Sequence, residues 1–170
     1  MILTHVTACS ENLVIGVDGG LPWNIPEDMK FFRDTTRNHV MIMGRKTFDS
    51  FNGKPLPSRY HIVITRDASS LKFEPNEKSP VKIVKSVEEA VTFAKTLTSQ
   101  WGEEVFIVGG GEIYKQTMGI TDKIYLTVIH QNFTGDTYYP IVSEKEFDLV
   151  EKSDRTEPIP FSFLTYLRKK

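Results

Sequence analysis

The stretch Glu104-Val-Phe-Ile-Val-Gly-Gly-Gly-Glu-Ile-Tyr114 decides the fold class of this chain. Residues 104–108 are mostly apolar and rich in β-branched side chains, which is typical of a strand in a parallel sheet with both faces buried. Gly109 to Gly111 follow directly, and residues 111–118 are expected to form a helix. A strand that passes through glycines into a helix indicates a βα unit of an α/β protein.

The same alternation of strand and helix extends through most of the chain. Further strands are predicted at 2–9, 39–44, 60–65, 81–84 and 123–130, and further helices at 26–36, 45–51 and 86–98. Two weaker alternating runs, near 147–152 and 162–168, have no helix between them. We therefore expect one α/β domain over residues 1–170, with a mostly parallel central sheet, flanking helices and an antiparallel C-terminal hairpin.

The predicted helix 86–98 carries a clear start signal. Ser86 is expected to be its N-cap, and Glu89 three residues later completes a capping box. The stretches 66–80 and 153–160 are rich in Pro, Ser and Glu, and we expect them to be surface loops of the same domain.

Composition and charge exclude several classes of protein. The chain has 170 residues, with 21 Lys+Arg against 22 Asp+Glu, so it has neither the basic footprint of a nucleic-acid-binding protein nor a polybasic membrane signal. Its one cysteine, Cys9, cannot form an internal disulfide, which favours a reducing compartment. We expect a cytoplasmic monomer that has no nucleic-acid or membrane partner.

The stretch Leu21-Pro-Trp-Asn-Ile-Pro-Glu-Asp28 places a carboxylate beside an indole. One interpretation is structural, because Pro at a first helical position followed by two acids makes a sound helix start. The other is functional, since Asp28 shares a helix face with Phe32 and follows the loop that holds Trp23. A single acid in an aromatic pocket suits a ligand with an amidine-like pair of donors.

Cations follow two of the predicted strands. Gly44-Arg45-Lys46-Thr47 offers free backbone N–H groups, two cations and a hydroxyl at a helix start, where phosphate binds. Arg66 occupies a corresponding place just after Thr65. Together the two arginines would hold an adenosine 2′-phosphate, which favours NADP(H) over NAD(H). The alternatives are that the cations are solvated surface charges, or that Asp67 pairs with Arg66.

The glycine run itself allows a ligand to approach the backbone. Tyr114 stands where the usual dinucleotide fingerprint has its third glycine, so a standard Rossmann domain is not expected. Taken alone, the glycines could form only a tight turn and Tyr114 could be a core residue. Arg59 ends a proline-bounded loop and could clamp a carboxylate, or it could be an ordinary surface arginine.

No metal or covalent chemistry is expected. The four histidines, His5, His39, His61 and His130, lack the spacing of metal ligands, and no Gly-x-Ser-x-Gly motif is present.

From Ile2 to Leu167 the chain resembles bacterial-type dihydrofolate reductases. The resemblance rests on eight stretches that occur in the family's order: Val14-Ile-Gly16, Leu21–Asp28, Met43-Gly-Arg-Lys-Thr47, Pro55-Leu-Pro-Ser-Arg59, Ile107-Val-Gly-Gly-Gly111, Tyr125-Leu-Thr127, Gly135-Asp-Thr137 and Phe163-Leu-Thr-Tyr166. It implies that NADPH gives a hydride to C6 of 7,8-dihydrofolate, with protonation at N5, to yield tetrahydrofolate for one-carbon metabolism. It also implies binding of antifolate inhibitors.

The resemblance assigns roles toward the substrate. Asp28 would bind the pterin amidine edge with Thr127 behind it, and Trp23 would help to order the water involved in protonating N5. Arg59 would hold the glutamate carboxylate. The remaining residues assigned to the substrate pocket are Val6, Ala8, Met29, Phe32, Phe51, Val108 and Tyr114.

The resemblance also assigns roles toward NADPH. Ala8 and Ile15 would meet the nicotinamide, and Asp136 would brace the loop that contains Trp23. Glu112 departs from the family's pattern, in which a basic residue can help with phosphate at that position. The residues assigned to the phosphates, ribose and adenine are Gly44, Arg45, Lys46, Thr47, Thr65, Arg66, Lys85, Ser86, Gly109, Gly110 and Gly111.

Two other functions remain open from the sequence. A related NADPH reductase of a pyrimidine intermediate in riboflavin synthesis shares the general fold, but it would not need Trp23 and Asp28 in this arrangement. A nucleotide- or pterin-binding module without turnover is the alternative from a different class.

Overall fold

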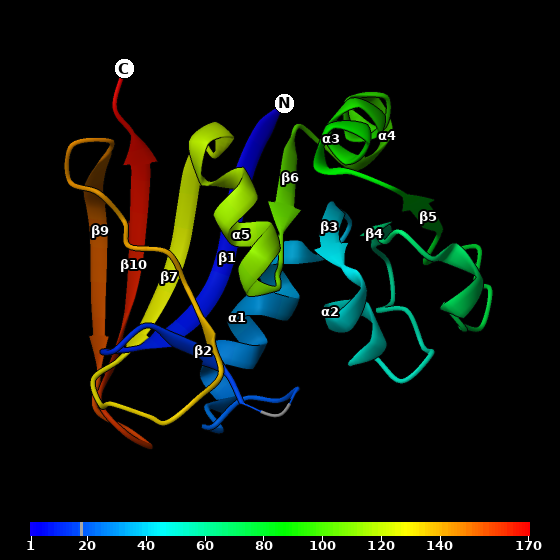
Figure 1. The fold of residues 1–170 in the computed structure, drawn as a ribbon. Helices are drawn as coiled ribbons and strands as arrows, with labels where there is room; N and C mark the ends of the chain where they lie inside the picture. Colours follow the sequence, from blue (N-terminus) through cyan, green and yellow to red (C-terminus); the bar gives the residue numbers. More distant parts are fainter. Residues whose placement is uncertain (18) are drawn as a thin grey trace.

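The computed structural model describes residues 1–17 and 19–170. Its centre is an eight-stranded sheet in the order β5-β4-β3-β6-β1-β7-β10-β9 (Figure 1). The strands of this sheet are β1 Ile2–Ser10, β3 Val40–Gly44, β4 Tyr60–Ile64, β5 Val81–Val84, β6 Glu104–Ile107, β7 Lys123–Ile129, β9 Phe147–Arg155 and β10 Phe161–Arg168.

The strand directions confirm the expected fold class. β5, β4, β3, β6, β1 and β7 are parallel, whereas β10 pairs antiparallel with both β7 and β9. The last two strands therefore form the expected C-terminal hairpin at one edge of the sheet. Because β1 lies between β6 and β7, the N-terminal strand occupies the middle of the molecule.

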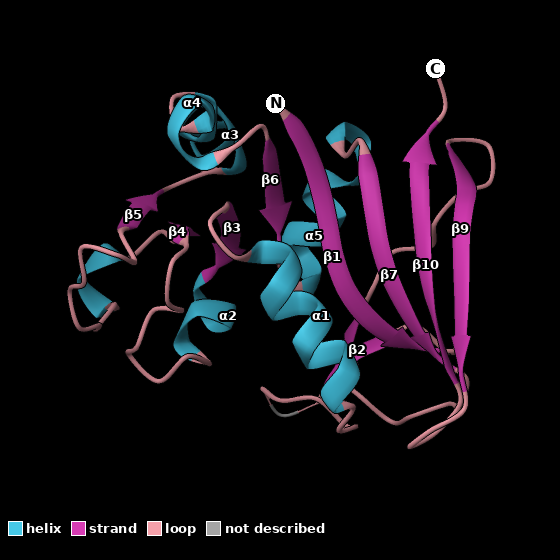
Figure 2. Cartoon of the chain, turned by 180° about the vertical axis from the view of Figure 1, so that it is seen from behind, coloured by secondary structure: helices cyan, strands magenta, loops and turns pink. Residues whose placement is uncertain are grey.

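Helices cover both faces of the sheet. The helices are α1 Pro26–Thr36, α2 Arg45–Asp49, α3 Val87–Lys95, α4 Thr98–Trp101 and α5 Gly111–Thr117, with short 3₁₀ turns at η1 Ala68–Ser70 and η2 Met118–Ile120. The opposite views in Figures 1 and 2 place α5 and α3 on one face and α1 on the other. None of the helices in the described part of the chain is long and apolar enough to cross a membrane.

The alternation of side chains along β3 shows how the core is divided. Val40 and Ile42 join one buried cluster, which includes residues of α3 and α5. Met41 and Met43 join a second cluster on the other face, against aromatic residues of α1 and α2. Successive residues of a strand point to opposite faces, so a continuously apolar strand serves both layers.

The start of α3 is built as its sequence predicts. The Ser86 hydroxyl accepts a hydrogen bond of 3.1 Å from the Glu89 backbone N–H. The Glu89 carboxylate reaches back to the N–H of Lys85, at 2.9 Å, rather than to that of Ser86. The helix ends at Lys95, and the remainder of the predicted segment 86–98 leads into the separate short helix α4.

Two expectations need correction. The predicted loop 153–160 is too long, because β9 continues to Arg155; its end is polar since the strand lies at the sheet edge, where side chains meet water. A second small sheet was not predicted: β2 Val14–Gly16 pairs with β8 Thr137–Tyr138. Strands of three and two residues are too short to show a periodic pattern.

Candidate active site

The two acids at the start of α1 have different surroundings. Glu27 faces outward, and its carboxylate accepts a hydrogen bond of 2.9 Å from Nε of Arg155 on β9. Asp28 is turned inward, where its Oδ1 accepts a hydrogen bond of 2.7 Å from the Thr127 hydroxyl on β7. Burial raises the pKa of Asp28, and the bond from Thr127 partly opposes this shift. Helix-start chemistry therefore accounts for Glu27 but not for the inward carboxylate.

The indole of Trp23 belongs to a cluster that lies next to the hydrogen bond between Thr127 and Asp28. It packs with Ala8, Ile25 and Phe133, and its ring centroid lies 5.4 Å from that of Phe133. Strand register places Ala8 directly beside Thr127, so this cluster adjoins the bond between Thr127 and Asp28. The indole Nε1–H is buried and finds no acceptor among the residues that the structure describes. A buried donor of this kind suits a bound water or ligand.

Four of the residues expected to form the apolar wall are brought together, whereas Ala8 lies in a separate cluster with Ile25 and Phe161. Val6, Val108, Phe32 and Phe51 belong to a single buried or partly buried cluster. Met29, next to Asp28 on α1, is 57% exposed and lies outside that cluster.

Tyr114 is a buried residue beside the glycine run. Its hydroxyl donates a hydrogen bond of 3.0 Å to the carbonyl of Val6, and its ring packs against His5 and Tyr139. Burial raises the pKa of this hydroxyl. Tyr114 is 3% exposed and contacts the backbone of Val6, so it supports the pocket residue Val6 from the interior of the protein.

Arg59 is not the surface arginine of the alternative interpretation, because it is only 3% exposed. Its Nε donates to the Thr36 hydroxyl at 2.9 Å, and its two terminal nitrogens donate to the carbonyls of Pro57 at 2.6 Å and Arg33 at 2.7 Å. Burial and the neighbouring cations Arg37 and Arg33 lower its pKa. Three bonds fix the plane of the guanidinium, and two of its five N–H donors remain for an anion.

The starts of α2 and α5 lie side by side at the ends of β3 and β6. The N–H of Gly44 donates a hydrogen bond of 2.8 Å to the carbonyl of Gly109, which joins the two segments. Neither helix has a side-chain cap, so the first N–H groups of both helices are available to an acceptor.

We call the backbone of residues 44–47 and 109–111 the glycine cradle. Two of its glycines cannot be replaced without displacement of their neighbours. Gly109 has a φ of +124°, and a Cβ there would lie 3.2 Å from the Thr47 hydroxyl. A Cβ on Gly111 would lie 2.9 Å from the side chain of Thr137 and 3.8 Å from that of Ile15. The glycine run is therefore more than a tight turn, because the backbone of Gly109 lies close to Thr47 and that of Gly111 lies close to Thr137. This cradle fits the phosphate groups and ribose of a dinucleotide.

The two arginines of the predicted cofactor side are both at strand ends. Arg45 begins α2 and lies 3.4 Å from the carboxylate of Asp49, while Arg66 follows β4 and is exposed. Asp67 uses its carboxylate on the N–H and hydroxyl of Ser69, which lower its pKa, and no Arg66–Asp67 ion pair occurs in the described part of the chain. The alternative interpretation, in which Asp67 pairs with Arg66, is thus not supported.

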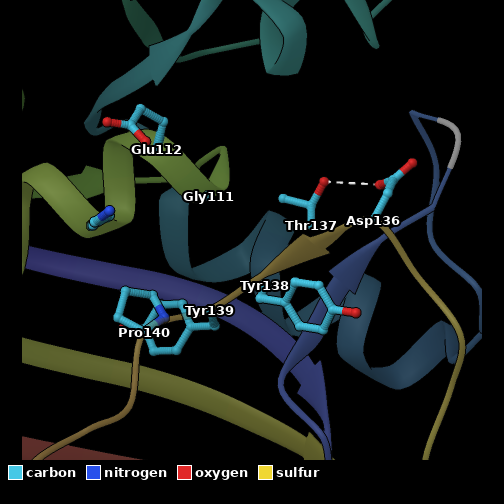
Figure 3. A pocket seen from close by; sticks show the side chains of 8 residues that line it. Gly111, Glu112, Asp136, Thr137, Tyr138, Tyr139 and Pro140 are labelled. Carbon is cyan, nitrogen blue, oxygen red and sulfur yellow. Dashed lines mark hydrogen bonds between the residues drawn. The ribbon is translucent and has the colours of Figure 1, made fainter.

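The small sheet ties the Trp23 loop to the segment before β8. The N–H of Asp136 donates to the carbonyl of Gly16 at 3.0 Å, and the Thr137 hydroxyl donates to the Asp136 carboxylate at 2.9 Å. Figure 3 shows these two residues beside a hollow of about 410 Å³ between α5 and residues 136–140. Glu112 lines its other side, next to Gly111. Lys115 of the same helix also lines the hollow. A carboxylate therefore lies at position 112, immediately beyond the cradle.

Two of the histidines pack behind site residues: His5 lies against Tyr114 and His61 against Phe51. His5 and His61 are buried, and His5 bridges the hydroxyls of Tyr139 and Thr117 at 2.8 and 2.7 Å. Residues 1–17 and 19–170 contain no cluster of His, Cys, Asp and Glu that could hold a metal ion.

Sequence reasoning missed Phe133 and the supports of Arg59. Phe133 reaches Trp23 from the segment after β7, more than a hundred residues away along the chain. The acceptors for Arg59 are mainly backbone carbonyls, which every residue has. Neither arrangement leaves a signal in a single sequence.

This is an α/β protein with a mostly parallel sheet, a glycine cradle at the carboxyl ends of β3 and β6, and an inward carboxylate at Asp28. Proteins of this class bind ligands at the carboxyl ends of their strands. The family model described as dihydrofolate reductase matches residues 2–168. Curated relatives named dihydrofolate reductase include that of Haemophilus influenzae, 37% identical with 99% of this chain and 100% of the relative covered, and that of Bacillus subtilis, 33% identical with 99% and 95% covered.

A solved structure titled as dihydrofolate reductase from Enterococcus faecalis complexed with NADP(H) and RAB-propyl superimposes with a TM-score of 0.86. It is 30% identical in sequence, and the match covers 99% of this chain and 97% of that one. This chain belongs to the dihydrofolate reductase family.

Proposed function

We propose that the protein reduces 7,8-dihydrofolate to 5,6,7,8-tetrahydrofolate and uses NADPH as its cofactor. The observation that carries this proposal is the inward carboxylate of Asp28, held by Thr127 at 2.7 Å next to the cluster of Ala8 and Trp23. NADPH, when bound, supplies the hydride, so the chemistry left to the chain is alignment and proton supply.

Asp28 binds and orients the pterin. Its carboxylate can accept two hydrogen bonds from the amidine edge of the ring, and Thr127 fixes the carboxylate from behind. Because burial raises the pKa of Asp28, the group holds a proton more readily than an exposed carboxyl does. The Trp23 indole N–H positions a water near N5, and this water carries the proton.

The apolar cluster and Arg59 select the rest of the substrate. Val6, Phe32, Phe51 and Val108 exclude water from the pterin and benzoate rings. The fixed guanidinium of Arg59 presents its two remaining donors to the glutamate carboxylate.

Most of the cofactor side is formed by segments that follow four neighbouring parallel strands, β5, β4, β3 and β6. The backbone of Gly109 to Gly111, together with Thr47, holds the pyrophosphate, and Ile15 and Ala8 contact the nicotinamide. Arg45 and Arg66 read the 2′-phosphate, since both follow strands at the same edge of the sheet. The remaining contacts we assign to the cofactor are those of Gly44, Lys46, Thr65, Lys85 and Ser86.

We further propose that residues 1–170 act as one domain, as a monomer in the cytoplasm, without a nucleic-acid partner. The near-neutral net charge of -1 supports the last point. Antifolate compounds that present an amidine-like edge to Asp28 would compete with the substrate.

One assay tests the proposal. Purified protein is mixed with NADPH and either dihydrofolate or the ribosylated pyrimidine substrate of riboflavin synthesis, and the loss of NADPH absorbance is followed. We expect oxidation of NADPH with dihydrofolate and none above background with the pyrimidine. Turnover of the pyrimidine alone would replace this function with the related reductase. Binding of both ligands without turnover would instead identify a binding module.

A further inference from the structure

We infer that Asn12 and Phe133 are positioning residues that hold the Trp23 indole in place over the site. This inference rests on the proposed function of Trp23. The three residues come from the turn between β1 and β2, the segment between β7 and β8, and the loop before α1.

The Asn12 side chain clamps one residue of the opposite segment at two points. Its Nδ2 donates a hydrogen bond of 2.8 Å to the carbonyl of Phe133, and its Oδ1 accepts one of 3.1 Å from the N–H of the same residue. These partners are 121 positions apart in the chain. Because an amide side chain satisfies both backbone groups of Phe133, the clamp fixes the position and the direction of that backbone.

Further hydrogen bonds fix the clamp itself. The Ser10 hydroxyl donates to Oδ1 of Asn12 at 2.5 Å and accepts from the N–H of Val14 at 2.9 Å. Beside it, the N–H of Glu11 donates to the carbonyl of Gln131 at 3.1 Å. The turn is thereby tied both to the end of β1 and to the segment that carries Phe133.

The ring of Phe133, held by this clamp, packs against the indole of Trp23. The two ring centroids are 5.4 Å apart, with an angle of 60° between the ring planes. Both rings pack on the same small cluster, which contains Ala8, Ile25 and Phe161. Since the indole N–H is buried and finds no acceptor in the described part of the chain, the contact with Phe133 sets where that N–H points.

The inference separates positioning from binding. Neither Asn12 nor Phe133 is among the residues that we place against substrate or cofactor. A displaced indole should slow proton supply at N5, because misplacement by about 1 Å can cost up to roughly 10²-fold in rate. Affinity for NADPH should hardly change, because its proposed contacts lie in the cradle.

The test is a double-mutant cycle on the hydride step. Single-turnover rates with ordinary and deuterated NADPH are measured for Asn12→Ala, Trp23→Phe and the double variant, with Asn132→Ala as the control from the same segment. We expect Asn12→Ala to slow the isotope-sensitive rate by about tenfold, to leave the NADPH Kd within about twofold, and to cost nothing further in the Trp23→Phe background. Asn132→Ala should match the wild type.

A conservative variant and a spectroscopic signal complete the design. Asn12→Asp retains the acceptor for the Phe133 N–H but loses the donor, so its rate should fall between those of Asn12→Ala and the wild type. In a Trp101→Phe background Trp23 is the one remaining tryptophan, and its emission should move to longer wavelength in Asn12→Ala.

The outcomes are distinguishable. Additive losses in the cycle, or Trp23 emission that Asn12→Ala leaves unchanged, would overturn the positioning role. If the wild type does not reduce dihydrofolate at all, the proposed function fails, and the emission signal still decides whether the clamp of Asn12 on Phe133 holds the indole.

Discussion

The hydroxyl of Thr127 and the carboxylate of Asp28, 99 positions apart in the chain, meet in a hydrogen bond of 2.7 Å. It joins the first turn of α1 to the middle of β7, and it is the point at which the substrate half of the proposed site is attached to the sheet. The donor Thr127 is itself buried, at 2% exposure, whereas Asp28 is partly exposed.

Replacement of Asp28 should abolish most turnover. In Asp28→Asn the amide can still accept from Thr127, so the fold is retained, but it can no longer accept two bonds from the pterin or hold a proton. General acid–base contributions are typically about 10² to 10⁴-fold in rate, and we expect a loss of this size at neutral pH. Steady-state assays compare the variant with Glu27→Gln, which removes the outward acid. Activity within a few-fold of wild type in Asp28→Asn would contradict the assignment.

The same substitution should stabilise the ligand-free protein. The pKa of Asp28 is raised in the folded state, so its ionised form opposes folding once the pH is above the unfolded value of 3.8. Removal of this charge should raise the free energy of unfolding at neutral pH by about 0.5–2 kcal/mol, as is common for stabilising changes at functional sites. Urea unfolding should show the gain at pH 7 and its loss as the pH falls below 3.8, where the carboxyl is protonated in both states. A gain that is independent of pH would exclude the charge as its cause.

The two strand-end arginines should determine the preference for NADPH over NADH. Substitution of Arg45 and Arg66 by Ala removes the groups proposed to face the 2′-phosphate, which NADH lacks. Charge-assisted hydrogen bonds contribute about 1.5–3 kcal/mol each, so the ratio of the two dissociation constants should fall by more than about tenfold. Titration of both cofactors against the double variant and against Lys115→Ala, a cation on α5, measures this ratio. Equal weakening of both cofactors would show that the arginines do not read the phosphate.

Arg59→Ala should weaken the binding of dihydrofolate more than that of a truncated pterin without glutamate. The guanidinium is held by Thr36 and by the carbonyls of Pro57 and Arg33, so the donors that remain can serve only a ligand that carries a carboxylate at that point. We expect an increase in Kd of about tenfold or more for dihydrofolate and little change for the truncated ligand. Similar losses for both ligands would indicate that Arg59 acts through the structure of the site.

The buried histidines should make the protein sensitive to acid. Burial lowers the pKa of His5 to about 3 and that of His61 to about 4, whereas both have the ordinary value of 6.5 in the unfolded chain. Unfolding therefore takes up protons below pH 6.5, and stability that is fully present above that pH declines toward pH 4 by up to about 1.4 kcal/mol per pH unit for each histidine. Free energies of unfolding measured at several pH values should show a shallower slope in His5→Asn. An unchanged slope would mean that His5 does not titrate on unfolding.

Most of the fold could be predicted from the sequence, because the strands inside the sheet are largely apolar and alternate with helices that have their own start signals. The glycine run and the Ser86 cap are local features, and both hold in the structure. The end of β9 was predicted as a loop because its residues are polar, and an edge strand buries little surface. β2 and β8 acquire their structure only by pairing with each other across more than a hundred residues.

In the candidate site too, residues with a local sequence signal could be predicted, and contacts between distant segments could not. Asp28 could be selected from the sequence because an acid beside aromatic residues is unusual, and the structure adds that Glu27 next to it is turned away. Met29 was assigned to the pocket wall by the resemblance; in the structure it is 57% exposed, because one step along a helix rotates a side chain by about 100° from that of Asp28. The clamp from Asn12 to Phe133 depends on backbone groups of a distant segment, which no local pattern encodes.

The hydrogen bond from Gly44 to Gly109 makes the glycine cradle a rigid part of the proposed site. It fastens together the ends of two neighbouring strands of the large sheet, so the wall of the cleft that holds the cradle cannot open without breaking sheet structure. The opposite wall is the loop of Trp23, which is anchored through strands of only three and two residues. We therefore expect the tryptophan side to move more readily than the glycine side when substrate enters or product leaves.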